Sequence, residues 1–573
     1  MQIIKTFIKF FAFVLPVTVS AQSTYLTQGS KEAHFVDRLE IMQQKNTDLN
    51  FSSLKPFSRK FIVQEAEFID SIRKDPAAKG AKYVKFSKVD EYNMRSLLMN
   101  NSEWVTGSLD GFKSKLPWFK TFYKTPPNFF EVHTKDFFLA INPVLQISAG
   151  SETDNDKSTD DGALKYVSSR GITLRGMIGR KVGFSSTIID NQERGPSYFQ
   201  QYVQTAKAVP GVGFYKPFKT DPSQQDYFDG RGYITFNATK FIDLQFGYDK
   251  NFIGNGYRSL FLSDWGNSYL FLKLNTKVWK FNYQNLFMEL TPRHIRNGDS
   301  LIDRKYAAMH HLSLNVTKWL NLGLFEGVIF GRTNRFDFQY LNPIIFYRHI
   351  EGTVGSPDNA LAGFDFKANI MHKLQLYGQL MLDEFILKKI KNDPGYWANK
   401  YGIQVGAKYV DAFGIKNLDL QGEINRVRPF TYSHKDTIGN YTHYNQPLAH
   451  PLGSNFQEFI GIINYQPIKK LYINARMIYY YKGLDSNGVD YGGDIFRVYT
   501  DRPRESGFKV GNGNKLTVLN ALLEVSYEIK QNIYLELTFQ QRNSKVAFTP
   551  GSISSTFFSG GVRINMFKRQ YDY

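Results

Sequence analysis

The chain has 573 residues, and its 71 Lys and Arg against 52 Asp and Glu give a formal net charge of +19, while aromatic side chains make up 16% of it. It contains no cysteine, which excludes disulfides, thiolate metal sites, cysteine nucleophiles and a lipid anchor on an N-terminal cysteine. After the first 21 residues, no apolar run reaches the roughly 18 residues that indicate a membrane-spanning helix. If the mature protein resides in a membrane, it must cross that membrane with strands.

Residues 1–21 have the features of an export signal. Lys5 and Lys9 precede an apolar stretch over residues 10–19, and Val19, Ser20 and Ala21 fit a small-residue cleavage site. We therefore expect this segment to be removed, which would leave a net charge of +17, and the mature protein to reach the envelope of a double-membraned bacterium.

Residues 22–136 are predicted to form a small helical extension in the periplasm. Apolar residues recur at helical spacing from Ser58 to Lys74, and Ser87 with Asp90 forms a capping box ahead of a second apolar-faced segment, Tyr92 to Met99. Two roles stay open for this extension: a cap packed under the rest of the protein, or a plug or docking surface for a periplasmic partner.

Residues 137–573 are predicted to be all-β. Apolar and polar residues alternate at period two, for example over residues 364–370, 418–425 and 532–540, which places one kind of side chain on each face of a sheet. About eighteen strands are expected, near residues 137–149, 170–180, 181–190, 231–239, 241–249, 268–278, 279–288, 308–317, 320–331, 362–371, 373–383, 399–410, 416–426, 455–465, 470–481, 516–528, 532–543 and 556–567.

The connections separate the possible architectures. A soluble sandwich or propeller would also show strands with one wet face. Here, however, tight turns follow every even strand and long loops follow every odd one, which is typical of a transmembrane outer-membrane up-and-down antiparallel β-barrel. An even strand number places both termini in the periplasm and the long loops outside the cell.

The long loops near residues 191–230, 332–361, 427–454 and 482–515 are where we expect function to lie. Arginine forks bind carboxylates or phosphates, and aromatic faces stack on sugar rings, so these loops predict binding of an anionic polysaccharide. The alternative is solvated charge and contact with outer-membrane lipid and lipopolysaccharide phosphate. The candidate ligand-binding residues are Arg332, Arg335, Tyr340, Tyr347, Arg348, Arg426, Arg428, Tyr432, Tyr441, Tyr444, Arg502 and Arg504.

Two loops raise the question of a metal. His434, His443 and His450 share one loop, but their spacing matches no established ligand pattern. Asp154 and Asp156 begin like a calcium loop, yet the glycine and the glutamate that such a loop requires are missing. We assign no metal and no cofactor, and the sequence leaves metal binding at either loop open.

The sequence does not indicate an enzyme. A hydrolase of the outer-membrane phospholipase type would need a histidine beside a serine on neighbouring strands, and His310, His311 and His372 are candidates only by elimination. No phosphate-binding glycine loop or paired-carboxylate signature is present, and we expect no nucleic-acid partner.

Several motifs resemble those of a known family. The stretch from Asn251 to Asp264, Tyr340-Leu341-Asn342-Pro343 and the Gly355–Asn359 segment resemble the Wzi-type capsule assembly family. The whole chain, including its 25–30 start and 566–573 end, is similar to the RemB-like proteins of gliding Bacteroidota. This resemblance implies an eighteen-stranded outer-membrane barrel with an N-terminal helical portion, acting as a surface lectin that helps capsular polysaccharide attach.

Three functions remain open on this evidence: a glycan-binding surface barrel, an interaction subunit of a larger gliding, secretion or barrel-assembly complex, and a diffusion porin. The lumen distinguishes them, because a porin needs a continuous wet path, a lectin needs an outward groove, and a subunit needs an exposed apolar patch.

Overall fold

The computed structural model describes residues 23–27, 29–74, 85–155, 162–179, 181–295, 300–332, 335–344, 346–355, 358–549 and 551–573. The predicted export signal lies outside these residues. So do Asp156 of the calcium-like loop, Arg180 of one tight turn, and Ser356 and Pro357 of the Gly355–Asn359 motif.

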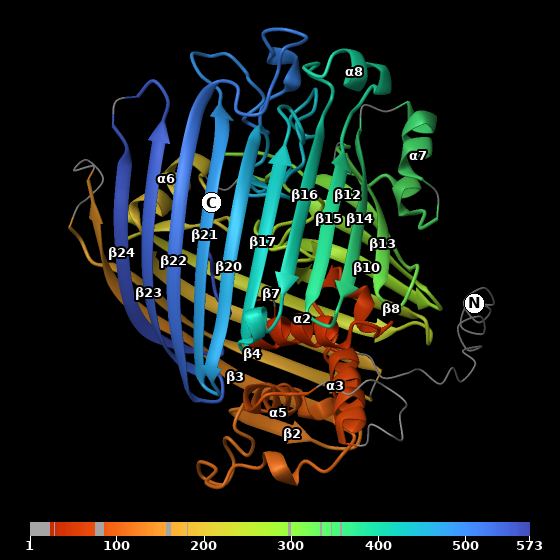
Figure 1. Cartoon of the computed structure of the whole chain (residues 1–573), viewed down its shortest axis with the longest axis vertical. Coiled ribbons are helices and arrows are strands. Elements are labelled where there is room, and N and C mark those ends of the chain that lie inside the picture. The colour runs from red at the N-terminus through yellow and green to blue at the C-terminus, as the bar shows by residue number, and fades with distance from the viewer. Residues whose placement is uncertain are drawn as a thin grey trace, which may run out of the picture.

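Eighteen long antiparallel strands close into a barrel (Figure 1), which confirms the predicted fold class and strand number. Each strand pairs with the next long strand along the chain, and β24 pairs with β3 to complete the ring. The strands are β3 (Phe137–Asp154), β4 (Lys165–Ile178), β5 (Val182–Arg194), β7 (Asp221–Asn237), β8 (Ile242–Asp249), β10 (Tyr269–Val278), β11 (Phe281–Leu290), β12 (Lys305–Asn315), β13 (Leu320–Phe330), β14 (Asn359–Ile370), β15 (Leu374–Leu382), β16 (Tyr401–Tyr409), β17 (Leu418–Val427), β20 (Phe456–Ile468), β21 (Leu471–Leu484), β22 (Asn514–Lys530), β23 (Ile533–Val546) and β24 (Ile553–Ile564).

The connections alternate as the sequence predicts. Tight turns join β10 to β11 and β22 to β23 at one rim, whereas the longest loops, β13–β14 and β17–β20 among them, lie at the other. The main difference concerns strand length. β7 begins ten residues before its predicted start, because its pairing with β5 continues as far as Gln225 opposite Glu193 and its first residue, Asp221, pairs with Phe218 of the preceding loop.

The barrel wall has an apolar outer face and a polar inner face. On β17, Ile424 is exposed on the outside, while Glu423 and Asn425 are buried on the lumen side. The same division holds on β14, where Phe364 faces out and Lys367 faces in. An apolar exterior around a charged interior is the arrangement that a lipid bilayer requires, and it is the reverse of a soluble protein.

Short strands and helices supplement the wall. β2 (Phe130–His133) pairs with β3 and β6 (Lys216–Phe218) with β7, while β1 (Leu54–Lys55) pairs with β9 (Phe252–Ile253) and β18 (Thr442–His443) with β19 (Gln446–Pro447). The long loops carry α6 (Ser197–Ala206), α7 (Tyr347–Val354) and α8 (Leu387–Asn392). Among the described residues, none of the helices has both the length and the apolar character needed to cross a membrane.

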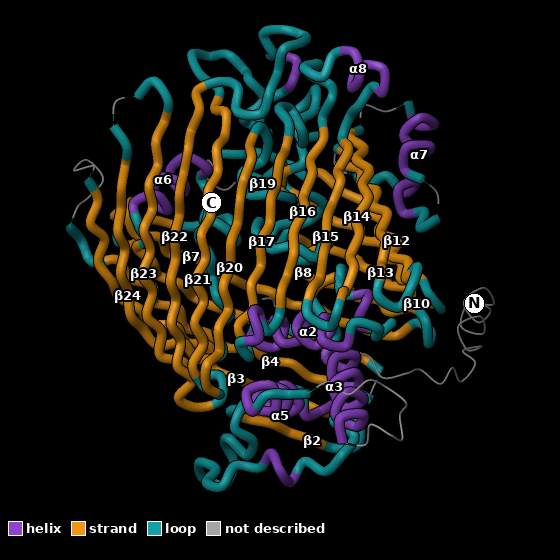
Figure 2. Tube along the Cα trace, in the orientation of Figure 1, coloured by secondary structure: helices purple, strands orange, loops and turns teal. Residues whose placement is uncertain are grey.

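Three N-terminal helices lie at the short-turn rim, where Figure 2 shows them in purple below the strands: α2 (Lys31–Gln43), α3 (Arg59–Lys74) and α5 (Lys88–Asn100). Local sequence explains their ends. The Ser30 hydroxyl accepts a hydrogen bond from the Ala33 amide at the start of α2, and Ser87 with Asp90 forms the predicted capping box at the start of α5.

Buried ion pairs hold these helices to the barrel. Arg38 of α2 contacts Asp90 of α5 at 2.9 Å and two wall-side carboxylates, Asp411 and Asp419, at 2.5 Å each. Glu40, on the same helix, pairs with Lys367 of β14 at 2.7 Å. The inward-facing charged residues of the wall therefore form ion pairs with oppositely charged residues of α2.

A charged residue placed on the outer face of the barrel should destabilise the protein. Leu537 lies on the outer face of β23, and we expect Leu537→Arg to lower the free energy of unfolding in lipid vesicles by about 2–4 kcal/mol, the effect of a cation on a lipid-facing position. Urea titration followed by gel mobility measures the change. Phe548→Arg, in the β23–β24 connection, is the matched control and should change stability little; equal effects would contradict the assignment of the outer face.

Candidate functional site

The barrel lumen is occupied by segments of the chain itself. The β8–β10 loop (residues 250–268) enters the barrel, and its β9 strand pairs with β1 from the N-terminal region. The β17–β20 loop (residues 428–455) packs against it, because the Tyr432 and Tyr441 hydroxyls donate to the Leu260 and Phe261 carbonyls, both at 2.7 Å. The third segment is the C-terminal tail, residues 565–573.

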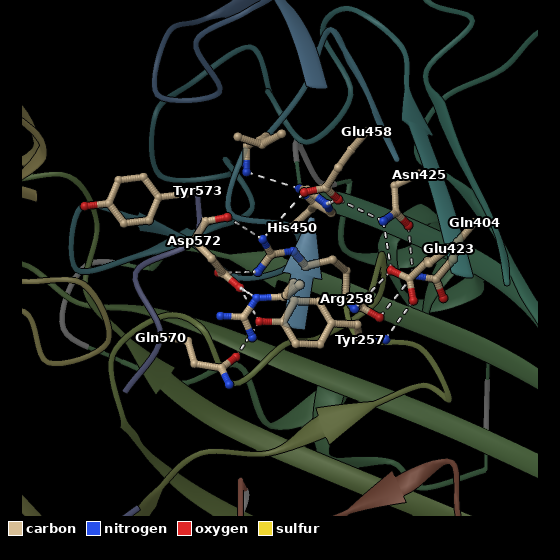
Figure 3. Close-up of polar contacts among 12 residues, drawn as sticks. Tyr257, Arg258, Gln404, Glu423, Asn425, His450, Glu458, Gln570, Asp572 and Tyr573 are labelled. Carbon is tan, nitrogen blue, oxygen red and sulfur yellow. Dashed lines mark hydrogen bonds and ion pairs between the residues drawn. The ribbon is translucent and has the colours of Figure 1, made fainter. Parts of the chain in front are cut away.

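The tail is fixed by two arginines (Figure 3). The Asp572 carboxylate lies 3.1 Å from Arg258 of the β8–β10 loop and 3.3 Å from Arg476 of β21. Arg258 also donates to the Asp572 carbonyl at 2.9 Å. Three elements that are distant in sequence therefore meet at one carboxylate.

The same cluster continues into the wall. Glu458 of β20 lies 3.5 Å from Arg258 and 2.7 Å from His450 of the β17–β20 loop. His450 Nδ1 accepts the Leu452 amide, so its proton is on Nε2 and is donated to Glu458. Glu423 of β17 accepts the amides of Tyr257 and Arg258. The charged members of this cluster, Arg258, Glu423, His450 and Glu458, are all buried.

Charge compensation determines the protonation state of the tail. Burial alone would raise the pKa of the Asp572 carboxyl, but Arg258 and Arg476 outweigh it and lower the pKa to about 2. Burial lowers the pKa of His450 in spite of Glu458, which agrees with the neutral tautomer. At neutral pH the tail therefore carries a fixed negative charge between two fixed positive ones.

The position of the C-terminus differs from the sequence prediction. β24 ends at the short-turn rim, but the tail turns back, so Tyr573 packs against Trp265 and Tyr202 inside the barrel instead of lying in the periplasm. Arg569 stabilises the turn-back, because it donates to Asn191 and to the Tyr227 hydroxyl at 2.9 Å. The inward-facing charges of the wall are the physical reason for this path.

A cavity of about 660 Å³ remains between the N-terminal helices and these segments. More Lys and Arg than Asp and Glu line it, together with several tyrosines. One of its cations is Lys250, whose pKa is lowered to about 7 by burial and by the neighbouring Arg231.

Most of the predicted ligand-binding residues are engaged inside the loops. Arg428 donates to the carbonyls of Asn399 and Tyr396, and Arg332 pairs with Asp358 at 2.7 Å. Tyr340, Tyr347, Tyr432 and Tyr441 are fully buried, and Tyr444 packs against His294. Arg426 is exposed on the same outer face as Ile424. Arg335 and Arg348 are exposed on the β13–β14 loop, and Arg504 is exposed at the long-loop rim.

Arg502 and Arg504 belong to a basic surface that we call the crown, formed by residues 387–397 and 499–509. The two segments are joined by backbone hydrogen bonds from Trp397 to Glu505 and from Phe508 to Gly395. The Arg502 guanidinium stacks over the Trp397 ring at 4.0 Å. Figure 1 shows α8, which belongs to the crown, at the long-loop end of the barrel. Exposed cations and partly exposed aromatic rings therefore lie side by side.

The crown residues Lys388 and Lys391 are not among the predicted ligand-binding residues. Both are exposed on α8, in the connection between β15 and β16. Three lysines within six residues of a long-loop connection were the available signal. The lumen residues Arg258 and Asp572 were not selected either, although both lie within segments that carry the family resemblance.

The histidines do not come together. His434 faces Asp436, His443 contacts the Ser268 carbonyl, and His450 pairs with Glu458. In the described part of the chain, no group of three His, Asp or Glu side chains is placed to hold a metal ion. Of the three histidines considered for catalysis, His311 pairs with Asp365, His372 with the Met42 carbonyl, and His310 stacks on Tyr347; none of these partners is a serine.

The tail contacts predict a response to one substitution. Asp572→Asn removes the charge between Arg258 and Arg476, and we expect it to weaken tail binding by about 3 kcal/mol, the lower end for breaking a buried pair, because Arg258 keeps Glu458. Hydrogen exchange of the 565–573 amides, monitored by mass spectrometry, should rise. Asp110→Asn, on the exposed surface, is the control and should leave this exchange unchanged.

The same pair predicts a pH dependence. Because the folded-state pKa of Asp572 lies below its unfolded value of about 3.9, its stabilisation is present above pH ~4 and is lost as pH falls toward 2. Tail protection that stays constant across this range would contradict the charge-pair description.

The family model for the capsule assembly protein Wzi matches residues 198–549, more than half of the chain. Among solved structures, the chain is similar to Wzi of Escherichia coli, described as an outer-membrane protein involved in group 1 capsule assembly and a carbohydrate-binding β-barrel. The identity is 13% and the TM-score 0.51, covering 94% of this chain and 98% of that one.

More distant similarity is found to OprD of Pseudomonas aeruginosa (9% identity, TM-score 0.39, 74% of this chain and 94% of that one) and to OccAB4 of Acinetobacter baumannii (10% identity, TM-score 0.41, 75% and 98%). No curated protein matches the sequence. On the family match and the eighteen-stranded outer-membrane fold, the chain belongs to the Wzi family of capsule assembly proteins.

Proposed function

We propose that this Wzi-family barrel holds an acidic polysaccharide at the cell surface through its crown and makes or breaks no bond. The observation that carries the proposal is the group of exposed cations beside aromatic rings at the long-loop rim, above a lumen occupied by the chain itself. The carbohydrate-binding E. coli barrel to which the chain is similar supports it.

The residue types suit such a ligand. Arg504, Lys388 and Lys391 supply charges for the carboxylates or phosphates of an acidic glycan, while Tyr396 and Tyr499 supply ring faces for sugars. Arg502 is held by Trp397 and Glu505, which reduces the entropy it would lose on binding. The other engaged residues, Arg428, Tyr432 and Tyr441 among them, are proposed to shape the loops.

The orientation forms part of the proposal. We place the long loops outside the cell and the N-terminal helices in the periplasm, with residues 1–21 removed on export, residues 22–136 as the periplasmic extension and residues 137–573 as the barrel. The occupied lumen argues against a diffusion porin, because Arg258 and Asp572 join across it.

A link to gliding motility is a finer proposal. It rests on the resemblance of the whole chain, including its 25–30 start and 566–573 end, to the RemB-like proteins of gliding Bacteroidota.

One observation favours a second function, that of a subunit in an envelope complex. A hairpin over residues 114–124, closed by the Ser114 amide donating to the Lys124 carbonyl, exposes Leu116, Trp118 and Phe119 on the side of the N-terminal helices. Exposed apolar patches of this kind mark contact surfaces. We propose a periplasmic protein as its partner if the polysaccharide role fails.

The crown predicts a specific loss of binding. The triple variant Lys388→Ala, Lys391→Ala and Arg504→Ala should weaken retention of an acidic polysaccharide by about fivefold to a hundredfold, because each exposed contact with an anion contributes a few tenths to about 1 kcal/mol. Binding of purified acidic capsule fragments to the detergent-solubilised barrel measures the effect.

The matched control removes three cations from the opposite rim: Lys181→Ala, Lys240→Ala and Lys280→Ala, all in tight turns. Their net-charge change is the same, so equal loss in both variants would indicate a general charge effect and overturn the crown as the site. Tight binding by both variants would favour the subunit function.

A further inference from the structure

The β13–β14 loop does not cover the barrel mouth; instead, it lies on the outer wall. Figure 1 shows α7, which belongs to this loop, outside the strands at the edge of the barrel. Its Tyr347 and Ile350 pack with outward-facing residues of the wall, such as Phe287 and Val328. This loop therefore shares the face that the bilayer covers elsewhere.

Beneath the loop, the wall carries a row of polar residues on its lipid side. Asn285, His310 and Glu326 are paired across β11, β12 and β13, and all three have the outward parity of the exposed Leu324. In hydrocarbon, unpaired polar groups cost several kcal/mol each. A bare wall at this position would not be compatible with lipid.

The loop contacts two members of this row, His310 and Glu326. The Tyr347 ring stacks on His310 at 4.0 Å, and the Arg348 amide donates to Glu326 at 3.2 Å. The Tyr283 hydroxyl, also on the outer wall, donates to the Pro343 carbonyl at 2.6 Å. These contacts explain why the loop folds onto the wall instead of extending into solvent.

The contact between the loop and the wall reaches the middle of strand β12. His310 lies five residues along β12 from its long-loop end, about 17 Å of strand. The next outward residues on β12 and β13, Leu312 and Leu324, are apolar, and Leu324 is exposed. The loop therefore covers the half of β12 that lies nearer the long loops, and an exposed apolar wall continues below it.

The outer side of the loop has two kinds of exposed residue. Phe338, Ile344 and Phe346 are 79%, 83% and 76% exposed, which is unusual for large apolar side chains in water. Arg335 and Arg348 are exposed on the same segment. Apolar side chains flanked by cations are typical of segments that lie in a membrane interface with anionic lipid.

We propose that the β13–β14 loop is a lipid-binding segment, in which Phe338, Ile344 and Phe346 insert among outer-leaflet acyl chains and Arg335 and Arg348 bind the phosphates of a lipopolysaccharide-type glycolipid. Continuity with the lipid-facing wall and charge complementarity identify lipid as the occupant. This assigns two of the predicted glycan-binding arginines to the membrane. The proposal rests on the proposed orientation, with the long loops outside the cell.

Depth measurements test it directly, because the chain contains no cysteine and accepts a single label. Spin labels are attached at Phe346→Cys and Ile344→Cys in bilayers that contain the phosphorylated glycolipid. We expect greater accessibility to oxygen than to a water-soluble nickel chelate. Leu537→Cys, on the lipid-facing outer wall, is the reference for a label in lipid, and Phe548→Cys, 95% exposed in the β23–β24 connection, is the aqueous reference.

Two results would overturn the proposal. An aqueous pattern at residue 346 like that at residue 548 would place the loop in water, and an immobilised label accessible to neither reagent would indicate a protein partner. Labelling of Phe548→Cys on intact cells with a membrane-impermeant reagent tests the orientation separately, so a failure of the proposed topology is distinguished from a failure of lipid binding.

Substitution of Arg335 and Arg348 tests whether these two arginines bind the glycolipid phosphates. Arg335→Ala with Arg348→Ala should reduce co-purifying phosphorylated glycolipid about five- to tenfold, as expected for two lost charge-assisted contacts. Arg335→Lys with Arg348→Lys, which keeps the charge, should retain most of it. If the glycolipid stays bound to the alanine variant, or if binding of acidic polysaccharide falls instead, these arginines do not bind the lipid phosphates.

Discussion

The structure depends on one constraint: a barrel wall that is apolar outside must carry its polar side chains inside, and those side chains need partners. Arg476, Glu458 and Lys367 all face the lumen and are buried. Water could solvate them in an open pore, but here the chain supplies the partners itself. The tail brings Asp572 to Arg476, and α2 brings Glu40 to Lys367. The occupied lumen follows from the charge pattern of the strands.

The same constraint acts on the outside of the barrel. Where β11–β13 place Asn285, His310 and Glu326 on the lipid side, a loop folds over them and presents apolar residues in their place. The long loops thus have separate tasks. One covers the wall, two occupy or support the lumen, and the crown remains free to contact what lies outside. This division explains why a cluster of arginines in a loop does not by itself indicate a ligand site.

The fold could be predicted because its signals are local in sequence. Alternation at period two and the lengths of the connections are visible within about twenty residues, and together they gave eighteen strands. The site residues could not be predicted in the same way. The partners Arg258 and Asp572 are 314 residues apart, and Arg428 is satisfied by carbonyls about 30 residues away, which no spacing reveals. Lys388 and Lys391 could have been predicted from the sequence. They lie in a lysine-rich segment of a long-loop connection, away from the inward-facing carboxylates of the strands.

The central claim is that this barrel presents a surface instead of a passage, and ion conductance tests it most directly. The full chain, inserted in a planar bilayer at neutral pH, should show little or no steady conductance, because the tail and the β8–β10 loop are joined across the lumen by Arg258 and Asp572. A chain truncated before Asn565 should conduct more. A large, steady conductance from the intact chain would contradict the account and return the porin function to first place.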